Sequence, residues 1–166
     1  MSRLIVALAL GIAVSPVFAS ETTVALPGCE YKLELPAKPT IKDGRPVIGS
    51  ALGPSRVALL RNRIPAYRVE CQGFSRLPPQ AGAAMIDDML EQTQRMNLGD
   101  FQHTVNENRL GTVVEYSGIE VRAGQRFVVS GRNVLGFSSV LSLVITEPAD
   151  TYPSKESLRV LRSLRR

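Results

Sequence analysis

Histidine is the side chain that most often acts as a base in enzymes, and this chain of 166 residues has a single one, His103. Next to it stands Thr104, but the segment has neither a Gly-x-Ser-x-Gly elbow nor a glycine-rich turn that could build an oxyanion hole. A nucleophilic enzyme needs a base beside its nucleophile. We therefore predict that the protein is not an enzyme. A hydrolase or metal enzyme that depends on His103 is the alternative.

Metal and cofactor sites are also poorly supported. Asp100 and Glu107 flank His103, but on a strand His103 and Glu107 would lie about 13 Å apart, which is too far for one ion unless the strand curves. One histidine and two cysteines exclude zinc-finger and zinc-ribbon spacings. Neither the P-loop pattern nor G-x-G-x-x-G occurs. We predict no cofactor and no bound metal.

Residues 1–19 are predicted to be a secretory signal peptide. Arg3 supplies the positive start, an uncharged apolar run follows from Leu4 to Val14, and Val17-Phe18-Ala19 fits a cleavage site. The apolar run is too short to span a bilayer comfortably as a helix. No second apolar run of about 20 residues follows. We therefore predict a periplasmic or secreted protein with no transmembrane segment after cleavage.

Export changes the meaning of the two cysteines. In an oxidising compartment they most simply form one disulfide, Cys29 to Cys71. Both lie in strand-like stretches, and neighbouring strands would bring the sulfurs within bonding distance. A reactive thiol is the alternative, but the chain has no C-x-x-C motif and its histidine is far away in sequence.

Basic residues are the remaining signal, with 20 Lys and Arg against 15 Asp and Glu and a net charge of +5. Four arginines cluster around one connection and are a candidate binding surface: Arg56, Arg61, Arg63 and Arg68. Nucleic-acid binding would suit a higher charge and interleaved aromatic residues, so we predict no nucleic-acid partner. An envelope protein or an anionic envelope component is the predicted partner. The alternative is a solvated basic face, and the sequence assigns no oligomeric state.

The elements that must position these residues form one α+β domain over residues 20–166. Alternating polar and apolar residues predict strands at 31–35, 66–74, 101–105, 112–122, 126–132 and 137–146, with a bulge at Ser117-Gly118. Helical spacing predicts a helix over 81–97 and a second one that begins after Ser154. Residues 36–65 are rich in proline and glycine and are predicted to be a long connection. We expect an antiparallel β-sheet of about five to six strands with helices packed on its faces.

Three stretches resemble the PsbP-like fold family: Tyr31 to Leu35 ending at Pro36, Val140 to Thr146, and Pro153 to Leu164. That family includes extrinsic proteins of the oxygen-evolving complex and many exported bacterial proteins. The resemblance implies a non-catalytic binding or assembly role. We therefore expect an exported, non-enzymatic binding or assembly module of the cell envelope. A periplasmic small-ligand carrier, with its pocket between sheet and helix, is a further alternative.

Overall fold

The computed structural model describes residues 21–44, 53–74 and 81–166. The predicted signal peptide, residues 1–19, lies outside these ranges and remains a prediction. In chain order the elements are β1 (Thr22–Ala25), β2 (Lys32–Leu35), β3 (Thr40–Asp43), β4 (Ser55–Leu60), β5 (Ala66–Gly73), α1 (Ala81–Gln94), β6 (Gly99–Asn108), β7 (Gly111–Arg122), β8 (Gln125–Leu135), β9 (Ser139–Pro148) and α2 (Lys155–Ser163).

Seven strands form the larger sheet, in the order β3-β4-β5-β9-β8-β7-β6, with every neighbouring pair antiparallel. Strands β1 and β2 form a separate antiparallel pair. The predicted mixture of an antiparallel sheet and helices is confirmed, but the count of five to six strands is wrong. The reason is that β3 and β4 form within residues 36–65, which we predicted to be a long connection with either a short strand or a turn of helix at 56–60. All four side chains of β3 are exposed, so no alternating pattern marks this edge strand in the sequence.

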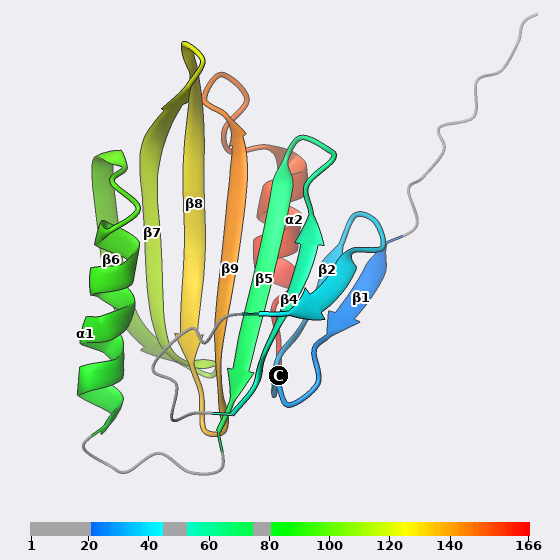
Figure 1. Ribbon diagram of the computed structural model, residues 1–166, viewed down its shortest axis with the longest axis vertical. Helices are drawn as coiled ribbons and strands as arrows, with labels where there is room; N and C mark the ends of the chain where they lie inside the picture. The colour runs from blue at the N-terminus through cyan, green and yellow to red at the C-terminus, as the bar shows by residue number, and fades with distance from the viewer. Residues whose placement is uncertain (1–20, 45–52, 75–80) are drawn as a thin grey trace, which may run out of the picture.

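The two helices lie on opposite faces of the larger sheet (Figure 1). Helix α2 and the β1–β2 hairpin cover one face, where Val160 and Leu164 join the main core. Helix α1 packs on the other face, where Met85 and Met89 join a second core cluster with Val140 of β9. We call these the α2 face and the α1 face. The prediction of helices on the faces of the sheet is therefore confirmed.

Helix α1 covers only one end of its face. Along β9, the side chains that point to the α2 face are buried, whereas three that point to the α1 face are only half-buried: Ser142, Val144 and Thr146. On the α1 face of β9, only Val140 is fully buried. A half-buried strip of sheet is therefore left beside the helix.

Two local predictions are wrong. The bulge expected at Ser117-Gly118 is absent from β7, which pairs with β8 without a break, and the irregularity falls instead at the start of β6. Gly118 lies opposite this irregularity, between Ser117 and Ile119, and a Cβ there would lie 2.6 Å from the Cβ of Leu98. Phe137, expected inside the last strand, precedes β9 and is 79% exposed.

The Cys29–Cys71 disulfide is present, with an S–S distance of 2.04 Å. The pairing is as predicted, but the two cysteines do not lie on neighbouring strands. Cys29 lies in the turn between β1 and β2, where its N–H donates to the carbonyl of Leu26. The disulfide therefore ties the β1–β2 hairpin to β5 of the larger sheet.

The hairpin is also bonded to the end of the chain. The backbones of Lys32 and Arg165 exchange two hydrogen bonds of 2.8 and 3.0 Å. The N–H of Glu34 donates to Oγ of Ser163. The first two strands and the last helix consequently form one layer.

Candidate functional site

The structure does not bring the four arginines of the predicted surface to one place. Arg56 forms an ion pair with Asp43 on β3. Arg63, in the turn between β4 and β5, donates two hydrogen bonds of 2.8 and 2.6 Å to the carboxylate of Glu156 on α2. These two arginines therefore serve contacts within the fold. The other two line a groove on the α1 face: Arg61 and Arg68.

This groove, which we call the α1 groove, follows the half-buried strip of β9. Two adjoining cavities of about 330 and 400 Å³ make it up, and they share Arg68, Met96 and Val144 as lining residues. Its floor runs along β9 from Ser142 to Thr146. At ~3.4 Å per residue this floor is about 14 Å long. The α1 groove is therefore elongated and open to solvent along one side of α1.

The charged side chains of the α1 groove leave an excess of positive charge. Arg68 is bonded to Glu70, which is buried, and Arg122 is bonded to Glu120 at 2.7 Å. The hydrogen bond to Glu120 raises the pKa of Arg122 above its ordinary value. Arg61 has no carboxylate within ion-pair distance among residues 21–44, 53–74 and 81–166. Three arginines against two glutamates give the lining a net charge of one positive unit.

The lining of the α1 groove is mixed, with apolar side chains beside the polar Ser142 and Thr146 of its floor. Val129 and Val144 lie on the sheet, and Met89 and Met96 come from α1 and the residues just after it. Methionine side chains are flexible and polarisable, so they adapt to ligands of different shape. The groove thus offers several apolar side chains with guanidinium groups beside them.

A buried amide lies at the end of the α1 groove nearest α1. Asn133 is 5% exposed, and its Nδ2 donates to Oγ1 of Thr93 at 3.4 Å. Its Oδ1 accepts no hydrogen bond among the described atoms. An unpaired buried acceptor costs roughly 1–3 kcal/mol, so a donor supplied by a ligand would be favourable here.

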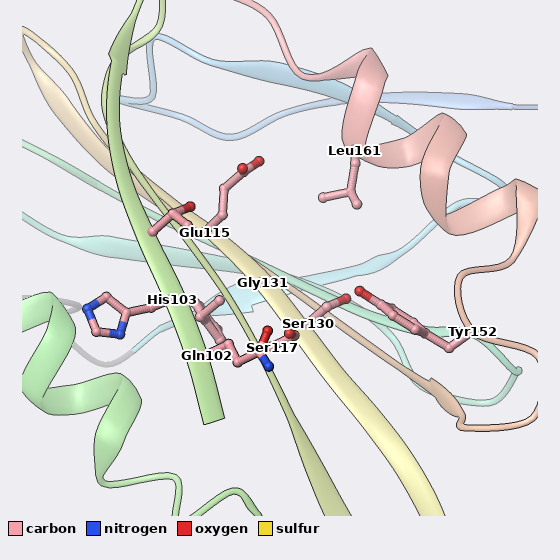
Figure 2. Close-up of a pocket in the computed structure, with 10 residues that line it drawn as sticks. Gln102, His103, Glu115, Ser117, Ser130, Gly131, Tyr152 and Leu161 are labelled. Atoms are coloured by element: carbon pink, nitrogen blue, oxygen red, sulfur yellow. The ribbon is translucent and has the colours of Figure 1, made fainter. Parts of the chain in front are cut away.

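His103 does not join a catalytic group. It lies on β6 and stacks on Phe101, with 5.7 Å between the ring centroids. Figure 2 shows its ring pointing away from the carboxylate of Glu115 and the hydroxyl of Ser117. Within the described part of the chain, no cluster of His, Cys, Asp or Glu side chains could hold a metal ion, and the residues that flank His103 make none. The structure therefore adds no support for the His103-dependent enzyme.

Sequence reasoning missed several lining residues of the α1 groove. Asn133 lies just outside the strand predicted at 126–132, whereas β8 continues to Leu135. Arg122 was assigned to a strand but not to a site. A polar residue at position 133 beside Val134 and Leu135, both of them apolar, was the available signal for Asn133.

No family model matches the chain, and no curated protein matches it. Several solved structures are similar to it, among them the following two. One is LpqN, which is involved in cell envelope biogenesis of Mycobacterium tuberculosis, at 16% identity and a TM-score of 0.45, covering 87% of this chain and 89% of that one. The other is PA94 from Pseudomonas aeruginosa, a protein of unknown function, at 16% identity and a TM-score of 0.40, covering 83% and 90%. The resemblance to the PsbP-like family is not confirmed, and the function is argued below from this chain's own residues.

Proposed function

We propose that this protein is an exported, non-enzymatic binding module of the cell envelope, and that its α1 groove binds an anionic amphiphile. Such a ligand has an acidic head and an apolar chain. The observation that carries the proposal is a groove in which half-buried Val144 and exposed Met96 share the lining with Arg61 and Arg68. This reading joins the predicted anionic envelope component with the predicted ligand carrier.

The export part of the proposal rests on two supports. One is the predicted signal peptide at residues 1–19. The other is the Cys29–Cys71 disulfide, since such bonds persist mainly in oxidising compartments. Within the described residues, no helix is long and apolar enough to cross a membrane.

The lining of the α1 groove suits each part of the ligand. Guanidinium groups bind carboxylates and phosphates through charge-assisted hydrogen bonds, which places the acidic head beside Arg61 and Arg68. An alkyl chain laid along Val144 toward Met96 gains about 0.8 kcal/mol for each methylene that leaves water. A hydroxyl on the far end of the chain would pair with Oδ1 of Asn133.

Calorimetric titration with dodecanoate, below its micellar concentration, tests the proposal. Dodecyltrimethylammonium is the matched probe, because it has the same chain with the opposite charge. Arg61→Ala is the clean variant, because its guanidinium bonds no carboxylate in the described structure and its loss leaves no buried charge. Arg68→Ala is unsuitable, because it would leave the buried carboxylate of Glu70 without its arginine partner.

We expect dodecanoate to bind more tightly than dodecyltrimethylammonium, and Arg61→Ala to weaken dodecanoate binding by about tenfold. Arg162→Ala, which removes an exposed arginine of α2 on the opposite side of the sheet, is the matched control and should bind like the wild type. Equal affinity for the two probes, or equal losses in the two variants, would contradict the proposal.

A further inference from the structure

A second groove lies on the α2 face, separate from the α1 groove. It has a volume of about 340 Å³ and lies between α2 and strands β6, β7 and β8 (Figure 2). Six polar side chains line it, and we call it the hydroxyl groove: Gln102, Thr104, Glu115, Ser117, Ser130 and Tyr152. Neither the predictions from the sequence nor the proposed function uses these residues.

The register of the strands builds the floor of the hydroxyl groove. Ser117 of β7 is paired with Gln102 of β6 on one side and with Ser130 of β8 on the other. Thr104 and Glu115 are paired in the next row that points to the same face. Neighbouring strands lie ~4.8 Å apart, so the row of three spans about 10 Å. Polar groups therefore cover a patch as wide as one or two sugar rings.

Ser130 is the residue whose surroundings indicate most directly that a ligand binds here. It is 6% exposed, and its Oγ has no hydrogen-bond partner within the described part of the structure. Buried hydroxyls nearly always have a partner, because leaving one unpaired costs free energy. Figure 2 shows the phenol of Tyr152 directed toward Ser130 across the hydroxyl groove. A ligand hydroxyl placed between them would supply the missing partner.

The rest of the lining suits the same chemistry. Arg132 donates to Glu115 through two nitrogens, both to Oε1, which leaves Oε2 to accept from a ligand hydroxyl. Because Arg132 and Glu115 carry opposite charges, the groove has no net charge. Gln102 offers both donors and acceptors. Tyr152, which is 40% exposed, offers an aromatic ring, and Leu161 of α2 adds an apolar surface.

We propose that the hydroxyl groove binds a neutral, polyhydroxylated ligand of one or two sugar rings. Hydroxyls of the sugar pair with Ser130, Ser117 and Glu115, and its apolar C–H face packs on the ring of Tyr152. The volume of about 340 Å³ lies at the small end of the range for ligand sites. The proposal does not depend on the α1 groove, because the two sites lie on opposite faces of the sheet.

Two-dimensional amide NMR of the full exported chain, titrated with glucose, N-acetylglucosamine, trehalose and chitobiose, tests this site. At least one sugar should give saturable shifts that centre on β7 and β8 around Ser117 and Ser130. Ser130→Ala should weaken that sugar by about five- to tenfold, and Tyr152→Ala should weaken it as well. Ser138→Ala, which removes an exposed serine from the turn before β9, is the matched control and should not change the affinity.

Three results would overturn the assignment. They are the absence of saturable shifts with all four sugars, shifts that map to the α1 groove, and an affinity that Ser130→Ala leaves unchanged in a folded variant. Dodecanoate binding by the Ser130→Ala variant separates this proposal from the other one. It should equal that of the wild type, so failure at one groove is distinguishable from failure at the other.

Discussion

Opening the Cys29–Cys71 disulfide should lower the free energy of unfolding by about 4 kcal/mol. The two cysteines are 42 residues apart in sequence. For a loop of this length, the chain-entropy relation gives a loss of about 13 cal/mol/K in the unfolded ensemble, which is about 4 kcal/mol at room temperature. A typical domain is stable by only ~5–15 kcal/mol. The reduced protein should therefore retain its fold but with a much smaller margin.

Two contributions to this loss can be separated by comparing three proteins. The oxidised and the reduced wild type differ by the cross-link, while both sulfurs stay in place. The double variant Cys29→Ala/Cys71→Ala also removes the sulfurs, and Cys71 is 1% exposed in the main core. We expect the double variant to lose a further 1–2 kcal/mol or so relative to the reduced wild type.

Urea unfolding followed by far-ultraviolet circular dichroism measures all three proteins. The reduced protein should also show a larger dependence on urea, because its unfolded chain is more expanded. A difference below about 1 kcal/mol between oxidised and reduced wild type would refute the entropy argument. It would mean that the unfolded chain already holds the β1–β2 hairpin near β5 without the bond.

Glu156→Gln should lower the free energy of unfolding by roughly 1–3 kcal/mol, because it removes the charged acceptor that binds the β4–β5 turn to α2; urea unfolding checks this. Gly131→Ala should cost about 1–3 kcal/mol in the same assay, because its Cβ would lie 2.2 Å from Cζ of Tyr116. Ser130→Ala should raise the thermal midpoint and increase the free energy of unfolding by up to about 1 kcal/mol, because it removes an unpaired buried hydroxyl. A fall in the thermal midpoint would show that the hydroxyl has a hydrogen-bond partner. Burial raises the pKa of Tyr31 and Tyr116 from 10.0 to about 12. The fold therefore favours the neutral phenols, and the stability they contribute is complete below pH 10 and is lost as the pH rises through 12, which ultraviolet titration alongside circular dichroism can follow.

The parts of the fold that local patterns dictate could be predicted from the sequence. Ser154 was expected to cap the last helix, and its Oγ does accept a hydrogen bond from the N–H of Ser157 at 3.1 Å. The apolar positions of the predicted helix indicated the buried side of α1 in part: Met85 and Met89 are buried, Ile86 and Leu90 are half-buried, and Met96 lies after the helix and is 42% exposed. Each of these features depends on residues within one or two turns, which a single sequence displays directly.

The parts that depend on distant partners could not be predicted. Arg56 and Arg63 were assigned to one binding surface with Arg61 and Arg68, but they pair with Asp43 of β3 and Glu156 of α2 and do not line the α1 groove. The half-buried strip arises because α1 buries only a narrow stripe of side chains and so covers a narrow part of the sheet. The position of this stripe on the sheet depends on the topology of the whole fold. For the same reason, the alignment of Gln102, Ser117 and Ser130 in one row could not be predicted without the strand register.

The layer shared by the β1–β2 hairpin and α2 has a consequence for biosynthesis. The hairpin leaves the ribosome before α2 does, and the hydrogen bond from the N–H of Glu34 to Ser163 spans 129 residues. The hairpin therefore has no helix to pack against until α2 has been synthesised, and its apolar side chains stay accessible to holding chaperones during that time. This layer of the fold can be completed only after translation has reached α2.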